Sequence, residues 1–256
     1  MALTDANIRD LADRISSILM SHAAHGLATS SLVEMGEITL RDGLIVAAAS
    51  SGSSLKQAWL LEREVVPNGW TDAPVDLLIR RKGNQGSIKD VGGVELKWWR
   101  RADKSNGTNR RRDLVRDFIR AAALYQQMES FAFVALLSTE VSWDSTTQTA
   151  KGDWPAMDLL CNEDTQKWNL INLKKCPAIK GAIRSLGNRV PIADIFHTKL
   201  ISSHTLGLSS GRAASAMVWS VVKPQRSKIM TAAEIKKFLR TSSDPQLPVD
   251  EPPNEA

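Results

Sequence analysis

Residues 74–99, PVDLLIRRKGNQGSIKDVGGVELKWW, decide the fold class of this 256-residue chain. The first part, PVDLLIRR (74–81), and the last part, VGGVELKWW (91–99), are apolar runs of the length that strands have. The polar stretch GNQGSIKD (83–90) between them predicts a turn region. The segment therefore predicts two strands that can pair as neighbours in one sheet.

The segments around these two strands predict a mixed α/β domain. Residues 54–66, SLKQAWLLEREVV, are expected to form a short helix. The polar stretch 100–111 is expected to be a loop, and residues 112–128 carry apolar side chains at helical spacing. FAFVALLS (131–138) predicts a buried strand. The order helix, strand, strand, helix, strand is that of a mixed α/β domain with one central sheet.

The remaining segments give weaker predictions. Residues 4–23 predict an amphipathic helix, whereas residues 31–50 are compatible with either a hairpin or an irregular helix. Residues 167–173 and 216–222 are candidate strands. Residues 231–239 are expected to form a closing helix with Thr231 as its cap.

These elements suggest three parts of unequal size. We expect a helical N-terminal segment (1–50) and a main domain (51–240) with its core at 54–138. Four acids, no base and four prolines in residues 241–256 predict a disordered tail.

The composition is that of an ordinary folded protein, with 43% hydrophobic and 24% charged residues. No window approaches 18 uninterrupted apolar residues and the N-terminus lacks a signal-peptide pattern, so we expect no membrane span, no export and a cytoplasmic location. Cys161 and Cys176 form neither a disulfide framework nor a zinc-ligand pattern.

Three charged residues stand inside the two apolar strands. Asp76 has apolar neighbours on both sides, and Glu95 and Lys97 are separated by Leu96. Because side chains alternate along a strand, Glu95 and Lys97 leave on the same face. Charges in such a setting are unfavourable unless they have partners or a function. If the two strands pair, all three groups meet at one place on the sheet.

Two carboxylates beside an amine suit metal-assisted hydrolysis of phosphodiesters. Mg²⁺ binds one or two carboxylates together with waters and substrate phosphate. Asp76 and Glu95 would supply the carboxylates, with Mn²⁺ as a substitute metal. The metal would lower the pKa of a bound water and offset charge on the scissile phosphate. Lys97 would orient that water or stabilise the pentavalent phosphorus.

The segments PVD (74–76) and VELK (94–97) resemble the PD-(D/E)XK motif of restriction-endonuclease-like nucleases, although the proline stands two residues before the aspartate. The resemblance implies that Asp76 and Glu95 bind the metal and that Lys97 assists the attacking water. It also implies a restriction-endonuclease-like core, a central mixed sheet flanked by helices in αβββαβ-type order. The expected function is that of a Mg²⁺-dependent DNA endonuclease of the restriction, defence or repair type.

The same family often carries a further acid on the helix before the aspartate strand. Glu62 and Glu64 are the two candidates in the helix expected at 54–66. On a helical wheel Glu62 falls in the middle of the apolar side, and Glu64 falls nearly opposite. A glutamate that faces the core is the anomaly, so Glu62 is predicted as the catalytic acid.

The middle of the chain is basic, with thirteen Lys and Arg against five Asp and Glu from Arg80 to Arg120. Such a surplus suggests a polyanionic partner. Arg112, Arg116 and Arg120 form one stripe on the 112–128 helix. For these arginines, pairing with Asp113 and Asp117 is an equal alternative to contact with phosphate. The side chains expected to contact nucleic acid are Arg100, Arg101, Lys104, Arg110, Arg111, Arg112 and Arg116.

Two other readings of these charges stay open. One is a catalytically inactive nucleic-acid-binding or regulatory protein on the same fold, and the other is a structural charge cluster without nucleic acid. For a nuclease, DNA is the expected partner, and the two-fold symmetry of duplex DNA would suit a homodimer.

Overall fold

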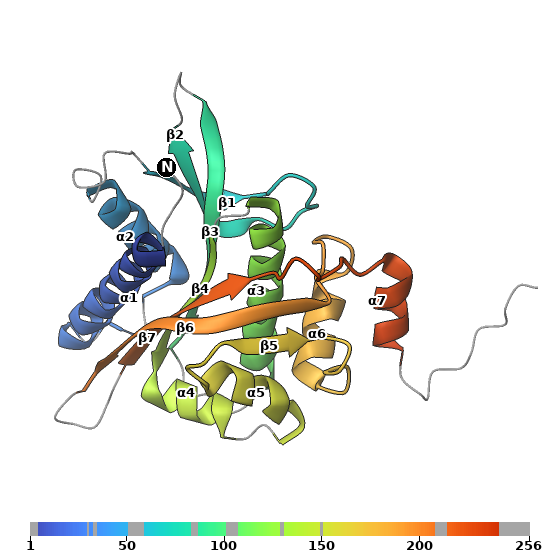
Figure 1. Ribbon diagram of the computed structural model, residues 1–256. Coiled ribbons are helices and arrows are strands. Elements are labelled where there is room, and N and C mark those ends of the chain that lie inside the picture. Colours follow the sequence, from blue (N-terminus) through green and yellow to red (C-terminus); the bar gives the residue numbers. More distant parts are fainter. Residues whose placement is uncertain are drawn as a thin grey trace, which may run out of the picture.

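The computed structural model describes residues 5–29, 31–32, 35–50, 59–82, 87–100, 107–128, 131–148, 151–207 and 214–240. The strands are β1 (Trp59–Val65), β2 (Val75–Lys82), β3 (Ile88–Trp99), β4 (Phe131–Thr139), β5 (Gln166–Asn169), β6 (Ile195–Leu206) and β7 (Ala214–Val222). They form one seven-stranded sheet in the order β1-β2-β3-β4-β7-β6-β5 (Figure 1). β3 and β4 run parallel, and every other neighbouring pair is antiparallel. The sheet is therefore open and mixed.

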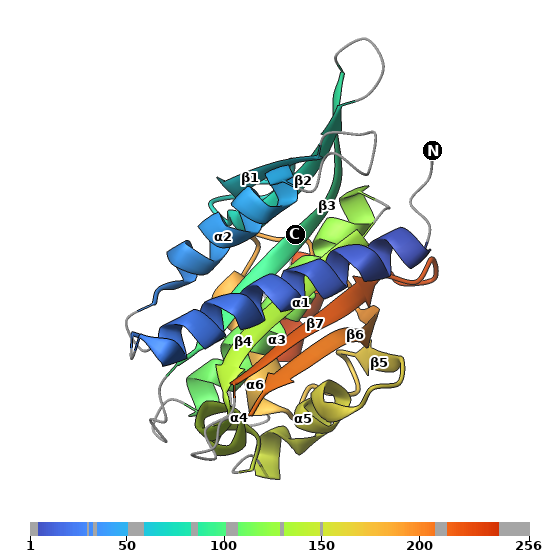
Figure 2. The ribbon, with the colours of Figure 1, turned by 90° about the vertical axis from the view of Figure 1, so that its left-hand side faces the viewer.

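Helices cover both faces of the sheet in the part of the chain that is described. They are α1 (Asp5–Ala28), α2 (Glu37–Ser50), α3 (Gly107–Met128), α4 (Glu140–Thr147), α5 (Trp154–Cys161), α6 (Pro177–Leu186) and α7 (Ala232–Leu239). α1 and α2 lie on one face, and α3 and α6 lie on the other (Figures 1 and 2). Among these helices, none has both the length and the apolar character that crossing a membrane requires.

The central strand β4 shows why both faces are covered. Phe133 and Leu137 belong to the hydrophobic cluster under α1 and α2, whereas Val134 and Leu136 belong to the cluster under α3 and α6. A strand that is apolar on both sides has to be buried on both sides. The alternation along β3 is the same, with Leu96 facing the α1–α2 layer.

The strands predicted from the sequence at 74–81, 91–99 and 131–138 are confirmed as β2, β3 and β4. The helix predicted at 112–128 is α3, which begins five residues earlier at Gly107 and so takes the end of the expected loop. The predicted helices at 4–23 and 231–239 are α1 and α7, and Thr231 forms a capping box with Glu234.

Two further segments resolve in different ways. Residues 31–50, which left a hairpin and a helix open, contain the helix α2. The candidate strand at 216–222 lies in β7, but the one at 167–173 ends at Asn169, where a turn begins. The tail expected at 241–256 lies outside the described residues.

The short helix predicted at 54–66 is wrong where the structure describes it. Trp59–Val65 form the edge strand β1, with Leu61 opposite Ile79 and Val65 opposite Val75 on β2. An apolar pattern over seven residues suits a strand as well as a helix, and the backbone hydrogen bonds to β2 decide between them. Residues 54–58 lie outside the described part. The element order from α2 to β4 is consequently α-β-β-β-α-β.

A buried ion pair fixes the first half of α3. Arg111 Nε donates to Asp153 Oδ2 at 2.8 Å, and the two residues are 6% and 3% exposed. Arg111 Nη1 also donates to the carbonyl of Thr146 at the end of α4. Asp153 Oδ1 accepts from the backbone N of Ala178 at the start of α6. The pair thus joins α3 to two other helices of its layer.

We predict that Asp153→Ala lowers the free energy of unfolding by about 3 kcal/mol, because it leaves the Arg111 guanidinium buried without its partner. Urea denaturation would measure the loss. Asp10→Ala is the control, since it breaks an exposed pair with Arg14 and should change stability by less than about 1 kcal/mol. Equal effects of the two substitutions would contradict the structural role of the buried pair.

Candidate functional site

Asp76 lies where the pairing of β2 with β3 ends. The antiparallel register runs as far as Leu77 opposite Val94, and Asp76 is the next residue. Its Oδ2 accepts a hydrogen bond from the backbone N of Leu96 at 2.8 Å. A side-chain hydrogen bond therefore continues where the main-chain pairing stops, and it fixes the carboxylate beside β3.

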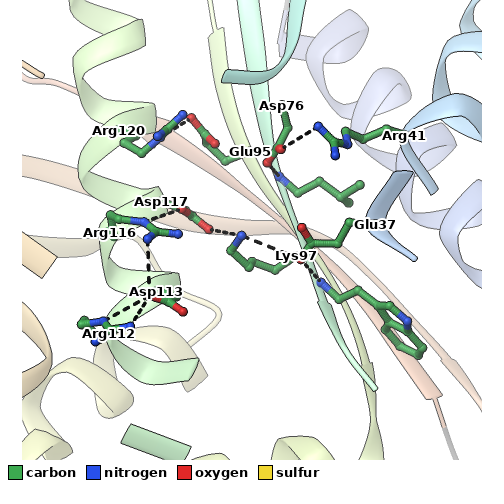
Figure 3. A network of polar contacts seen from close by, with 12 residues as sticks. Glu37, Arg41, Asp76, Glu95, Lys97, Arg112, Asp113, Arg116, Asp117 and Arg120 are labelled. Carbon is green, nitrogen blue, oxygen red and sulfur yellow. Dashed lines mark hydrogen bonds and ion pairs between the residues drawn. The ribbon is translucent and has the colours of Figure 1, made fainter. Parts of the chain in front are cut away.

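Glu95 and Lys97 project from β3 towards α3, as their spacing predicts. Glu95 Oε1 accepts from Arg120 Nε at 2.8 Å, and Lys97 Nζ lies 3.3 Å from Asp117 Oδ2 (Figure 3). Arg120 and Asp117 lie one turn apart on α3. Glu95 and Asp117 are each only 2% exposed. The buried acid of β3 thus pairs with a base of α3, and the buried acid of α3 pairs with a base of β3.

Three contacts hold Arg120 in place. Besides Glu95, its guanidinium donates to the carbonyl of Pro74 and lies over the ring of Trp70, 5.6 Å from the centroid. Trp70 and Pro74 belong to the segment between β1 and β2. The partner of Glu95 is therefore fixed from two sides.

Helix α2 supplies two more charges from the opposite side (Figure 3). Glu37 Oε1 accepts from the backbone N of Trp98 at 3.2 Å and lies 3.8 Å from Lys97 Nζ. Arg41, one helical turn later, lies 3.4 Å from Asp76 Oδ1 through Nη1. Lys97 is consequently placed between an acid from α3 and an acid from α2.

We refer to the charged side chains gathered here as the charge cluster. It contains four acids and four bases, so it is neutral when all are ionised. Its members are Glu37, Arg41, Asp76, Glu95, Lys97, Arg116, Asp117 and Arg120.

Burial makes the acids of the charge cluster difficult to ionise. It raises the pKa of Glu95 to about 8; Arg120 lowers that pKa, while the carboxylates of Asp76 and Asp117 raise it. Burial likewise raises the pKa of Asp117, and Lys97 opposes it. Asp117 in turn raises the pKa of Lys97. The ionised forms of these buried acids are therefore stabilised by the bases that pair with them.

Glu62, predicted as a further catalytic acid, lies elsewhere. It is on the strand β1, and its Oε2 accepts from Arg80 Nη1 at 2.6 Å. Glu64, the rejected candidate, reaches the charge cluster indirectly because its Oε1 accepts from Arg41 at 2.8 Å. Among the described residues the helix that precedes the aspartate strand is α2, and the helical wheel over 54–66 does not apply because Trp59–Val65 form a strand.

The acid that α2 brings to the site is Glu37, which the sequence reasoning missed. Glu37 and Arg41 share a helix face with the buried Leu40 and Leu44. An acid on an apolar helix face is the same signal that had favoured Glu62. It was hidden because residues 31–50 were not assigned to a helix.

Most described basic side chains expected to contact nucleic acid already have partners. Arg112 and Arg116 pair with Asp113 at 3.1 and 3.5 Å, and Arg116 also pairs with Asp117, as the alternative interpretation held. Arg100 Nη1 donates to the carbonyl of Met35 at 3.1 Å.

The other four side chains predicted to contact nucleic acid differ in how the structure places them. Arg111 is buried against Asp153, so its charge has a structural use and a surface contact is not supported. Arg110 is half-buried. Arg101 and Lys104 lie outside the described residues.

We predict that Glu95 makes stability depend on pH. Because its pKa is raised from the ordinary 4.5 to about 8, the folded chain binds a proton that the unfolded chain has already lost. The free energy of unfolding should therefore fall as pH rises above 4.5, over the range in which the unfolded chain has lost this proton and the folded chain retains it. Glu95→Gln should lack this part of the decline. Urea titrations of both proteins in EDTA test it, and parallel pH profiles would contradict it.

The comparisons with known proteins assign no role to these residues. No family model, no curated protein and no solved structure matches this chain. What the arrangement can do chemically follows from its own geometry: two carboxylates on adjacent strands, a lysine two residues after the second of them, and further acids and bases paired around them.

Proposed function

We propose that this chain is a Mg²⁺-dependent nuclease that hydrolyses DNA phosphodiester bonds at Asp76, Glu95 and Lys97. The observation that carries the proposal is the end of β2–β3 pairing at Asp76, directly beside a strand that presents Glu95 and Lys97. The order α2-β1-β2-β3-α3-β4 adds support, because it is the αβββαβ order expected of restriction-endonuclease-like nucleases.

Magnesium fits the donor chemistry of the site. Among the described residues no three acidic, histidine or cysteine side chains form a ready-made cage, but Mg²⁺ commonly uses one or two carboxylates and completes its shell with water and phosphate. Among the described residues, Arg41 approaches Asp76 Oδ1 at 3.4 Å, and Arg120 engages Glu95 through Oε1. Asp76 and Glu95 would hold the ion.

Lys97 acts in this proposal as a cation. The raised pKa keeps its amine protonated, so it donates hydrogen bonds to the attacking water or to the phosphate and does not take up a proton. Asp117 and Glu37 fix the position of the amine from two sides. When bound, the metal would supply a water of lowered pKa and offset the charge on the phosphate.

A specific observation favours a second candidate function. Each acid of the charge cluster has a protein cation nearby, so the cluster is electrically complete without a metal. A non-catalytic nucleic-acid-binding or regulatory protein on this fold would retain such pairs. Metal-dependent cleavage of DNA separates the two candidates.

The central prediction is that the purified chain cuts duplex DNA in Mg²⁺ or Mn²⁺ and not in EDTA. Asp76→Asn and Glu95→Gln should abolish cleavage, and Lys97→Ala should slow it by about 10²-fold or more. Asp76→Asn should still bind DNA, because the carboxylate repels phosphate until a metal arrives. Glu62→Gln and Asp42→Asn, which alter acids paired elsewhere, are the controls. Cleavage by Asp76→Asn at the wild-type rate would refute the assignment.

A second prediction concerns Asp117, which pairs with Lys97. Asp117→Asn should lower the pKa of Lys97, because Asp117 is the main cause of its elevation. The cleavage rate should then decline at a lower pH than in the wild type, as Lys97 loses its proton. Asp113→Asn is the matched control, since Asp113 lies on the same helix and pairs with Arg112 and Arg116. An unchanged alkaline limb in Asp117→Asn would exclude the positioning role.

A further inference from the structure

Arg41 occupies a position that the chemistry described so far does not use. It reaches the charge cluster from α2, on the side opposite the bases of α3 (Figure 3). Its Nη1 lies 2.8 Å from Glu64 Oε1 and 3.4 Å from Asp76 Oδ1, and its side chain is 11% exposed. A guanidinium therefore stands next to the carboxylate at which the strands separate.

The partner that holds Arg41 has an unusual backbone. Glu64 has φ 55, a left-handed conformation that residues with a side chain rarely adopt. It lies in β1 between Arg63 and Val65, which both have register partners on β2, and its side chain is 59% exposed. Residues in such a conformation persist only where surrounding contacts stabilise them, and they are frequent at functional sites. The ion pair with Arg41 is such a contact.

The guanidinium of Arg41 also has unused donors. Arginine carries five N–H groups in one plane, and both contacts above run through Nη1. Nε is buried and has no hydrogen-bond partner in the described part of the chain. By contrast, Arg120 is engaged by Glu95 and the Pro74 carbonyl through two different nitrogens. The guanidinium of Arg41 therefore has capacity for another anion.

We propose that Arg41 binds the phosphate of the nucleic-acid substrate beside Asp76, an inference that rests on the proposed nuclease function. A phosphodiester that approaches Asp76 and Glu95 meets two carboxylates and needs a cation on the α2 side. Planar guanidinium groups bind phosphate oxygens with two parallel hydrogen bonds. The 3.4 Å approach to Asp76 is the looser of the two contacts, so Arg41 can exchange it for phosphate while Glu64 keeps its hold.

The test is the binding of a duplex oligonucleotide in Ca²⁺, followed by fluorescence anisotropy at several salt concentrations. R41Q should weaken binding about tenfold or more and flatten the slope of log K against log salt by about 0.9, the loss of one phosphate contact. R63A is the matched control. Arg63 on β1 forms an ion pair with Asp42 on α2, and the side chains of both residues are exposed. R63A should leave the slope unchanged.

Two further measurements separate phosphate binding from support of Asp76. Mn²⁺ affinity without DNA, measured by electron paramagnetic resonance, should stay equal or rise in R41Q, because a cation next to Asp76 has been removed. R41K retains the charge and the pair with Glu64; it should keep the wild-type slope but bind DNA about threefold or more weakly, since it lacks the planar fork. Circular dichroism verifies that each variant is folded.

The outcomes distinguish this inference from the function on which it rests. A wild-type chain that neither binds nor cuts duplex DNA would overturn both. If the wild type binds and cuts DNA and R41Q equals it in affinity and salt slope, only the role of Arg41 is overturned. If R41Q does not fold, the same result with R41K has the same consequence. Loss of Mn²⁺ affinity in R41Q together with loss of DNA binding would also overturn it, because Arg41 would then act through Asp76.

Discussion

Glu95 is the residue on which the surrounding structure depends, because it places a carboxylate inside an apolar strand of the central sheet. Removing one partner of such a buried pair typically costs about 3–5 kcal/mol, so the partner has to be held firmly. Arg120 meets this requirement from α3, and Trp70 and Pro74 fix Arg120 from the segment before β2. One carboxylate thereby ties α3, the segment before β2 and the strand β3 together.

The same requirement explains why both helical layers reach this part of the sheet. β2 and β3 cease to pair at Asp76, and the backbone N of Leu96 is satisfied by a side chain there. Such an opening exposes polar groups that the sheet alone does not neutralise. α3 brings Asp117 and Arg120 to one side, and α2 brings Glu37 and Arg41 to the other (Figure 3). The charge cluster is thus assembled from elements far apart in the sequence.

The parts that sequence reasoning found are those with a local signal. Asp76, Glu95 and Lys97 stand out because charges interrupt apolar strands, and strand alternation correctly places Glu95 and Lys97 on one face. Thr231 was predicted as the cap of the helix at 231–239, and the structure confirms it within a capping box with Glu234. These features are fixed by neighbours within a few residues, so one sequence suffices to predict them.

The missed parts depend on distant partners. β1 is a strand because β2 pairs with it, and Arg111 is buried because Asp153 approaches from another helix. The sequence offered Asp117 as a partner of the arginines on its own helix, and only the fold brings it to Lys97. No composition or spacing within one segment carries such information.

The left-handed residue of β1 has a consequence for how copies of this chain meet. β1 has one strand neighbour among the described residues, so its other side is a free edge of the sheet. Edges of this kind attract strands of other molecules unless charge or irregular backbone interrupts them. Here three charged residues, Glu62, Arg63 and Glu64, follow one another, and the last of them has a left-handed backbone. The conformation that orients Glu64 towards Arg41 thereby also protects this border against edge-to-edge aggregation.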